Sequence, residues 1–416
     1  MHKPQVAKLH VDERLEHRIR RQFPWVFDKD ADFGASGPQL GDLVAIYGKR
    51  DQCIALGIYD PYSPIRVRIL GKPCTFSEAY FARRLDEALA RREASGIVSD
   101  QTNALRLVNG ESEGLPGIVL DAYAGTWVMK IYSAAWLPYL KAMLSVIEEG
   151  YFGPHASASR PDAYGVLPHR LILRFGREAL PVYEAAGYAE GALLLGEDDT
   201  PYADFVENGA RFRAQVFRGQ KTGFFLDQRD NRRFVRSLSE GRRVLDVCCY
   251  SGGFSIQAAM GGAREVWSLD GDRHALELVE QHYGLNAHDQ GVAACTRVLQ
   301  RGKMFAWLEQ AKAKRMKFDL IIVDPPSFAS SKAQTDQAVK SYQRLFSAAA
   351  DCLAPKGQML CCSCSSHVGS DMFGDIVSRT MRPRGAKIED CSGLPADHVA
   401  NFAEARYLKS WLVTLR

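Results

Sequence analysis

Three apolar runs of this chain each carry a side chain that can do chemistry at or near a predicted strand end. Asp246 lies in the first run, Asp324 in the second and Cys364 in the third. A carboxylate can accept or move a proton, and a cysteine thiolate is a nucleophile that can form a covalent intermediate. The runs are RVLDVCCYSGGFSIQAAMGGAREVWSLD (Arg243–Asp270), FDLIIVDPPSF (Phe318–Phe328) and QMLCCSCSSH (Gln358–His367).

The first run predicts a nucleotide site. It reads as a strand, a Gly-Gly turn, a short helix and a second strand, which is the front half of a nucleotide-binding βαβ unit. Gly252 and Gly253 carry no Cβ that would block a ligand lying against the backbone. Asp270 ends the second strand, where a carboxylate can accept the hydroxyl protons of a ribose. The motif alone leaves open an ordinary tight turn.

The residues around this turn favour S-adenosylmethionine over a dinucleotide. The turn lacks the G-x-G-x-x-G spacing that admits a pyrophosphate, and Asp246 suits a ligand with a cationic amine. S-adenosylmethionine has adenosine at one end and an ammonium group at the other. We therefore expect it to contact Asp246, Tyr250, Gly252, Gly253, Phe254 and Asp270.

The three runs fit one open parallel sheet. Strands buried on both faces read as continuous apolar runs, and the carboxyl ends of neighbouring parallel strands line one crevice. Asp246, Asp324 and Cys364 should therefore converge. The pattern predicts helices over 271–285 and 332–353 and a strand over 292–298. Alternating strands and helices indicate a doubly wound, Rossmann-like α/β sheet.

The connector QKTGFFLDQRDNRRFVR (Gln220–Arg236) precedes this sheet and is rich in charged and aromatic residues. As a plain helix start, Asp227 could cap the helix and the arginines could be solvated. The Phe224-Phe225 pair suggests instead a segment folded over a flat ligand. On that interpretation Phe225, Asp227 and Gln228 contact the cofactor. The substrate would contact Lys221, Arg229 and Arg232, together with Pro325 and Pro326 after the second run.

The N-terminal part reads as two further units. Alternating runs over 9–72, separated by turn residues, predict a small β-barrel, and a helix over 76–95 begins a separate α+β unit. Arg18, Arg20 and Arg21 stand beside Trp25, and arginines interleaved with aromatic residues can bind phosphates and stack on bases. The alternative is an entry segment whose aromatic rings cap the barrel.

Size and composition are those of a globular protein with two or three domains. The chain has 416 residues, 46% of them hydrophobic and 25% charged, and a formal net charge of +4. No apolar run reaches membrane-spanning length and no signal-peptide core is present, so we expect a cytoplasmic protein without a membrane partner. The ten cysteines lack a disulfide pattern. The Cys361-x-x-Cys364 pair has no second pair, so no metal is expected.

With these motifs in hand, the chain resembles the RlmI-type family of S-adenosylmethionine-dependent 23S rRNA (cytosine-5-)-methyltransferases over essentially its whole length. The shared motifs are RLVNGESEGLPGIVLD, KTGFFLDQRDNR, DVCCYSGGFS, DPPSF and SCS. The resemblance implies a PUA-like RNA-binding domain (1–73), a central α+β domain (74–218) and a class I methyltransferase domain (219–416). It implies large-subunit ribosomal RNA as the partner.

The resemblance also implies that Cys364 is the nucleophile and that Asp324 faces the target base. Carbon 5 of cytosine is a poor nucleophile, so a thiolate must first add at carbon 6. Two alternatives stay open: a methyltransferase acting on another RNA or base, and a non-catalytic RNA-binding assembly factor. The second rests on the missing acidic residue near Arg301-Gly302-Lys303, where the family usually has one. The oligomeric state is open, with a homodimer as one expectation.

Overall fold

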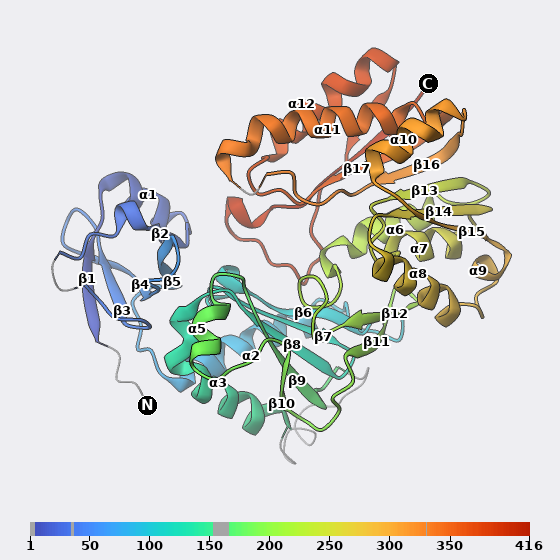
Figure 1. The fold of residues 1–416 in the computed structure, drawn as a ribbon. Helices are drawn as coiled ribbons and strands as arrows, with labels where there is room; N and C mark the ends of the chain where they lie inside the picture. Colours follow the sequence, from blue (N-terminus) through green and yellow to red (C-terminus); the bar gives the residue numbers. More distant parts are fainter. Residues whose placement is uncertain (1–4, 35–36, 153–165, 330) are drawn as a thin grey trace. The chain divides into compact units, whose positions relative to one another are not determined.

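The computed structural model describes residues 5–34, 37–152, 166–329 and 331–416. The chain forms two compact units, each assembled from separate segments (Figure 1). The first comprises Met1–Val206, Ala214–Leu226 and Ala396–Ala405, and the second comprises Glu207–Arg213, Asp227–Pro395 and Arg406–Arg416. The sequence did not indicate that residues 396–405 return to the first unit, and the three-domain division stays a prediction.

The first unit begins with the small barrel-like sheet that the alternating runs predict. Its strand order is β1-β3-β4-β5-β2, with β1 parallel to β3 and the other pairs antiparallel. Asp12 caps the helix that follows β1, because its side chain accepts from the Leu15 backbone N–H at 2.7 Å. The elements are β1 (Val6–His10), α1 (Glu13–Arg20), β2 (Trp25–Phe27), β3 (Leu43–Tyr47), β4 (Cys53–Tyr59) and β5 (Ile65–Gly71).

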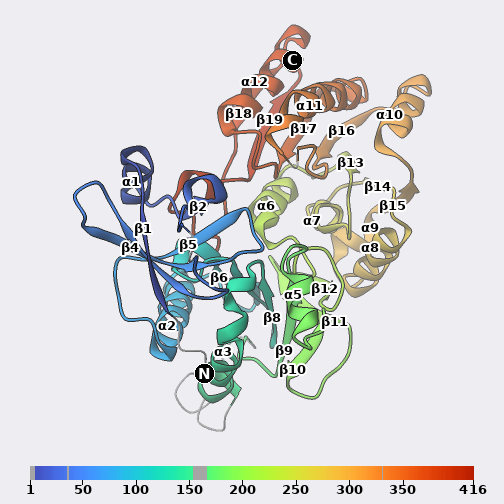
Figure 2. The ribbon, with the colours of Figure 1, turned by 60° about the vertical axis from the view of Figure 1, so that its left-hand side comes forward.

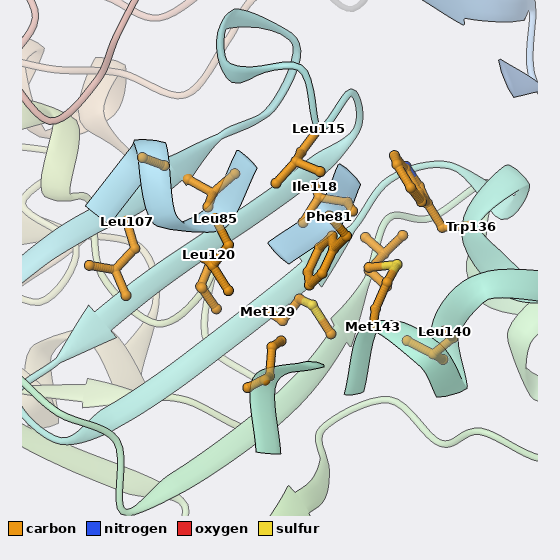
Figure 3. Packing of buried hydrophobic residues seen from close by; sticks show 14 of the residues in the cluster. Phe81, Leu85, Leu107, Leu115, Ile118, Leu120, Met129, Trp136, Leu140 and Met143 are labelled. Atoms are coloured by element: carbon orange, nitrogen blue, oxygen red, sulfur yellow. The ribbon is translucent and has the colours of Figure 1, made fainter. Parts of the chain in front are cut away.

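A second sheet, in the order β10-β9-β8-β7-β6, completes the first unit. Helix α2 packs on it through Phe81 and Leu85, which meet Leu107 and Leu120 of the strands (Figure 3). The helix predicted over 76–95 is confirmed. The elements are α2 (Glu78–Ala94), β6 (Ala104–Asn109), β7 (Ile118–Tyr123), β8 (Thr126–Ile131), α3 (Leu140–Ile147), β9 (Arg170–Phe175), α5 (Leu180–Ala185) and β10 (Ala192–Leu195). A two-stranded sheet follows, formed by β11 (Tyr202–Glu207) and β12 (Ala210–Gln215).

The second unit is built on the predicted doubly wound sheet. Its strand order is β15-β14-β13-β16-β17-β19-β18, with β15, β14, β13, β16 and β17 parallel and β19 antiparallel to both of its neighbours. The strands are β13 (Arg243–Val247), β14 (Glu265–Asp270), β15 (Thr296–Arg301), β16 (Phe318–Val323), β17 (Leu353–Ser363), β18 (Lys387–Asp390) and β19 (Lys409–Thr414).

Helices cover both faces of this sheet. Val247, Ile321 and Cys361 belong to a core shared with α10, α11 and α12, and α11 and α12 lie side by side (Figures 1 and 2). Asp246 alternates with Val247 and faces α7 instead, where Ser255 bonds it. The helices are α6 (Arg229–Ser237), α7 (Gly253–Met260), α8 (Arg273–Leu285), α9 (Gln290–Ala294), α10 (Met304–Ala313), α11 (Thr335–Ala350) and α12 (Ser370–Met381).

The strand predicted over 292–298 is wrong in its first half. Residues Gln290–Ala294 form α9 because the Asp289 side chain accepts from the Val292 backbone N–H at 3.1 Å, and the strand runs from Thr296 to Arg301. The helix predicted over 332–353 ends at Ala350, since Leu353 begins β17. No helix in the described ranges is long and apolar enough to cross a membrane.

Candidate active site

The carboxyl ends of β13, β16 and β17 lie next to one another in the second unit. Val323, the last residue of β16, pairs with Cys361 of β17. Asp324 follows β16 by one residue, and Cys364 follows β17 by one residue. Asp246 lies in β13, the other neighbour of β16. The parallel order therefore brings the three reactive side chains to one edge of the sheet, as the apolar runs predict.

Asp246 is a fully buried carboxyl group. Its Oδ2 accepts from Ser255 Oγ at 2.7 Å, while its Oδ1 is buried without a hydrogen-bond partner among the described residues. The pKa of Asp246 is raised to about 7, chiefly by burial; the Ser255 hydrogen bond lowers it and the charges of Asp324 and Asp270 raise it. A buried acceptor without a donor is costly, so a ligand with a cationic amine would stabilise the ionised form.

The turn after β13 has an unusual backbone. Cys248 and Tyr250 have φ values of 63° and 48°, and Gly252 has a φ of 76°. Left-handed conformations at residues other than glycine cost about 1–3 kcal/mol and gather at functional sites. A Cβ on Gly252 would lie 2.9 Å from both Cγ atoms of Val279 in α8. Packing against α8 and the positive φ therefore favour glycine at position 252, and its role in ligand access stays a prediction.

Asp270 holds the same turn from the neighbouring strand. Its Oδ2 accepts from the Tyr250 backbone N–H and its Oδ1 from the Asp272 backbone N–H, both at 2.9 Å. The carboxylate is half-buried and has about four acceptor sites, so capacity for two further donors remains. An unsatisfied carboxyl oxygen at Asp246 and a partly accessible carboxylate at Asp270 fit a ligand with an ammonium group and a ribose. Gly253 and Phe254 are buried at the start of α7.

Gln228 contacts Asp324 through its side chain. Its Nε2 donates to Asp324 Oδ2 at 2.9 Å, and its Oε1 accepts from Asn231 Nδ2 at 2.5 Å. Asn231 Oδ1 accepts in turn from Ser410 Oγ of β19 at 3.2 Å. This chain of hydrogen bonds orients the Asp324 carboxylate, and a contact of Gln228 with the cofactor stays a prediction.

The other residues of the connector have partners that the sequence did not predict. Asp227 is buried, and its Oδ2 accepts from the Tyr407 hydroxyl at 2.6 Å. Lys221 and Phe225 belong to the first unit, where Lys221 Nζ lies 4.6 Å from the centroid of the Phe225 ring. Contacts of these three residues with cofactor or substrate stay predictions.

Arg229 and Arg232 are buried next to Glu207. Arg232 donates from Nε and Nη2 to the two Glu207 oxygens, both at 2.6 Å, and Arg229 Nε lies 3.7 Å from Glu207 Oε2. The side chains are 5% and 3% exposed, and Glu207 is 0% exposed. Both arginines are thus buried beside Glu207, and their contact with a substrate stays a prediction. From the sequence, this pair could not be told from solvated arginines.

Cys364 is the half-buried cysteine at the strand edge, in contrast to Cys361 and Cys362, which are fully buried in β17. Burial raises the pKa of both strand thiols well above the ordinary value. None of the ten cysteines forms a disulfide. Pro325 is buried and Pro326 is exposed beside Asp324. In the parts of the chain that the structure describes, no cluster of histidine, cysteine and acidic residues could hold a metal.

Lys409, the first residue of β19, also lies at this edge and was not identified from the sequence. It is 2% exposed, and its Nζ donates to the carbonyl oxygens of Ser365 at 2.6 Å and Val368 at 2.7 Å. The available signal was a lysine inside the otherwise apolar strand YLKSWLVTL. Lysine is rarely fully buried, so a lysine within such a run is unusual and identifies a position to inspect.

Family comparisons agree with this geometry. Residues 188–392 match the S-adenosylmethionine-dependent methyltransferase family, and residues 9–72 match the PUA-like domain family. The ribosomal RNA large subunit methyltransferase of Deinococcus radiodurans is 40% identical over 410 residues, covering 97% of this chain and 96% of that protein. The chain belongs to the ribosomal RNA large subunit methyltransferase family.

A second family member and a solved structure extend the comparison. Ribosomal RNA large subunit methyltransferase I of Tolumonas auensis is 32% identical over 417 residues, covering 97% of this chain and 98% of that protein. The crystal structure of SMU.776 complexed with SAH has a TM-score of 0.81 at 20% identity, covering 98% of this chain and 100% of that one, and therefore shares the fold. The chain is an S-adenosylmethionine-dependent methyltransferase, which confirms the predicted cofactor.

In this methyltransferase, the arginines of the PUA-like domain are exposed but have intramolecular partners. The Arg18 guanidinium lies 3.4 Å from the Phe23 ring centroid, and Arg18 Nη2 lies 3.5 Å from Glu404 Oε1. Arg20 pairs with Glu16 at 2.8 Å, and Arg21 is exposed. Exposed ion pairs are weak, so a phosphate can compete for these arginines. Their contact with RNA stays a prediction.

Trp25 has the contacts that the aromatic-cap alternative describes. Its Nε1 donates to Glu111 Oε1 at 2.9 Å, and its ring meets Phe402 edge-on, with centroids 5.4 Å apart. Both contacts lie within the first unit. Trp25 is therefore held by the protein itself, and this geometry favours a packing role over base stacking.

Proposed function

We propose that this methyltransferase transfers a methyl group from S-adenosylmethionine to carbon 5 of a cytidine in large-subunit ribosomal RNA. The relatives' names supply the class of substrate. The observation that carries the chemistry is the pair Asp324 and Cys364, which follow the adjacent parallel strands β16 and β17 by one residue each. A thiol and a carboxylate side by side are what addition to a pyrimidine ring requires.

In the proposed reaction, the Cys364 thiolate adds to carbon 6 of cytosine and turns carbon 5 into an enamine carbon that can attack an electrophile. Asp324, protonated or sharing a proton with ring nitrogen 3, offsets the negative charge that develops on the ring. S-adenosylmethionine, when bound, supplies the electrophilic methyl group. Loss of the carbon-5 proton and breakage of the bond from carbon 6 to sulfur then release the Cys364 thiolate.

The cofactor would lie along the turn between β13 and α7. Asp246 would pair with its ammonium group through the oxygen that now lacks a partner, and Asp270 would accept the ribose hydroxyls. Tyr250, Gly253 and Phe254 would line the same turn. Because Asp246 is buried with a raised pKa, it must lose its proton when the cationic ligand binds.

The PUA-like domain and Lys221 would supply RNA contacts. Arg18, Arg20 and Arg21 are exposed on one domain, which suits non-specific phosphate binding. Deleting residues 1–72 should weaken RNA binding most at low salt and leave S-adenosylmethionine binding unchanged. A homodimer, the remaining expectation for assembly, can be measured by sedimentation equilibrium.

The test is a covalent trap. RNA with 5-fluorocytidine at the target has no proton to lose from carbon 5, so the protein should stay attached after methylation, and the adduct should map to Cys364. An adduct on another cysteine, or methylation at another base, would refute the proposal. Bisulfite sequencing of ribosomal RNA from cells lacking the gene should locate the cytidine. Absence of any change there, with intact cofactor binding, would favour an assembly factor.

A further inference from the structure

Lys409 is placed directly opposite the strand that leads to the nucleophile. In the antiparallel pairing of β17 with β19, Lys409 pairs with Ser363, the residue before Cys364. The side chain is 2% exposed, so the ammonium group lies inside the protein and not at its surface. A buried lysine this close to a reactive cysteine is rarely needed for packing, because a leucine or methionine would fill the same space without burying a charge.

The ammonium group holds the turn Ser365–Val368, which directly follows Cys364. It donates to the carbonyl oxygens of Ser365 at 2.6 Å and Val368 at 2.7 Å, and the Val368 N–H donates to the Ser365 carbonyl at 3.3 Å. These hydrogen bonds tie both ends of the turn to β19. Cys364 therefore lies between β17, which pairs with β19, and a turn that a side chain of β19 holds.

Among the described residues, no carboxylate forms an ion pair with Lys409. Its two carbonyl partners only partly replace the lost hydration of the ammonium group. Burial lowers the pKa of Lys409 to about 8, and the charge of Cys364 acts in the opposite direction and raises it. The attraction is mutual, so a charged Lys409 favours the thiolate form of Cys364.

Three further groups lie at or near the strand end. Asp324 follows β16, Cys362 lies in β17, and Tyr342 projects from α11 with its hydroxyl 2.9 Å from Ser363 Oγ. Burial raises the pKa of Tyr342, the Ser363 hydrogen bond lowers it, and the charges of Cys364 and Asp324 raise it, so the tyrosine stays neutral. A carboxylate beside the sulfur disfavours a second negative charge. A thiolate here needs a nearby positive charge.

We propose that Lys409 is a positioning residue for the nucleophile: its ammonium group orders the turn that follows Cys364 and stabilises the Cys364 thiolate. The proposal rests on the proposed role of Cys364 in cytosine methylation. The residue acts through the cysteine and touches neither the RNA base nor the cofactor. This role explains why the ammonium group of Lys409 is buried in β19 without a carboxylate partner among the described residues.

The test measures the ionisation of the Cys364 thiol and does not depend on methylation. The full-length protein is alkylated with iodoacetamide between pH 6 and 10, and the rate at Cys364 is read by peptide mass spectrometry. Lys409→Met should raise the midpoint of the Cys364 profile by at least one pH unit and slow alkylation at pH 7 about tenfold. Lys317→Met is the matched control, since Lys317 Nζ also donates to a backbone carbonyl, that of Asp351 at 2.9 Å, but at an exposed site. It should leave the profile unchanged.

Two outcomes would overturn the proposal. One is an identical Cys364 midpoint in the wild type and in Lys409→Met, with the buried Cys361 and Cys362 unreactive in both as a check on folding. The other is measured on the wild type alone: a Cys364 midpoint well above the ordinary thiol value of about 8.5 would mean that no cation stabilises the thiolate. Methylation by Cys364→Ala would refute the nucleophile without changing either midpoint result.

Discussion

Buried charges at the strand ends of the second unit differ from a buried ion-pair network in the first unit. In the first unit, Arg92 Nη2 donates to Glu113 Oε2 at 2.8 Å, and Arg106 donates to both oxygens of Asp121 at 2.8 and 3.1 Å. The two acidic side chains are 0% exposed and the arginines 3% and 9%. Arg92 and Arg106 also anchor residues 396–405 through Asp397. Each charge in this network has an opposite charge beside it.

At the strand ends of the second unit, buried charges lack such partners. Asp246 Oδ1 has no donor among the described residues, and Lys409 has carbonyl oxygens but no carboxylate. Removing one member of a buried ion pair leaves an uncompensated charge, whereas a group that is already uncompensated destabilises the fold as it stands. Breaking a pair in the first unit should therefore be costly, whereas the uncompensated buried charges of the second unit are candidates for functional groups.

The largest expected effect is at the reactive edge itself. If Cys364 is the nucleophile as proposed, Cys364→Ala should lower methyl transfer about ten-thousandfold or more and should leave S-adenosylmethionine binding unchanged. Single-turnover methylation and calorimetry measure the two quantities. Cys361→Ala is the control and should cost roughly 1 kcal/mol of stability. Comparable methylation by Cys364→Ala and Cys361→Ala would mean that the cysteine at the sheet edge has no more chemical function than the cysteine buried in β17.

The comparison of buried charges predicts opposite effects on stability. Glu113→Ala should lower the free energy of unfolding by about 3–5 kcal/mol, since it leaves Arg92 buried without its partner. Asp246→Asn should leave stability unchanged or raise it, because it removes a carboxyl that burial already disfavours as an anion. Urea denaturation of the two variants gives the result. Equal losses in the free energy of unfolding would show that Asp246 stabilises the fold as much as Glu113 does.

The raised pKa of Asp246 predicts a pH dependence. The folded protein without ligand keeps this group protonated up to about pH 7, whereas the unfolded chain loses the proton near its ordinary value of 3.8. Protonated Asp246 therefore makes its full contribution to the free energy of unfolding below pH 3.8. This contribution is lost as the pH rises through 7. Affinity for S-adenosylmethionine has the opposite slope and should rise about tenfold per pH unit between pH 5 and 7.

Calorimetry at several pH values tests this slope. Asp246→Asn, which cannot ionise, should bind more weakly and with an affinity that hardly changes over the same range. A wild-type affinity that is flat between pH 5 and 7 would mean that Asp246 does not face the ammonium group of the cofactor.

The smallest effect concerns Gln228, whose side chain donates a hydrogen bond to Asp324. Gln228→Leu should lower methyl transfer about 10- to 100-fold, because the Asp324 carboxylate loses a hydrogen bond worth about 1.5–3 kcal/mol, and should spare cofactor binding. Gln257→Leu is a matched control: Gln257 is also buried and donates to a backbone oxygen, that of Glu207 at 3.0 Å. Weakened S-adenosylmethionine binding in Gln228→Leu alone would restore the cofactor interpretation.

The sequence by itself determined the sheet, the nucleotide-type turn and the edge at which Asp246, Asp324 and Cys364 meet. Apolar runs of strand length specify burial on both faces, and parallel order places every carboxyl end on the same side. The convergence of these three residues does not depend on which side chains contact one another. It follows from strand direction alone, which is why it could be reached from spacing and residue type.

Only the tertiary structure decided what each polar side chain contacts. Glu207 takes Arg229 and Arg232, Gln228 turns to Asp324, and Lys409 reaches the turn after Cys364 from a strand 44 positions further along the chain. A hydrogen bond depends on positions fixed to a few tenths of an ångström by the packing of several elements. Local sequence carries no record of that packing, so an arginine that will be buried reads the same as one that will be solvated.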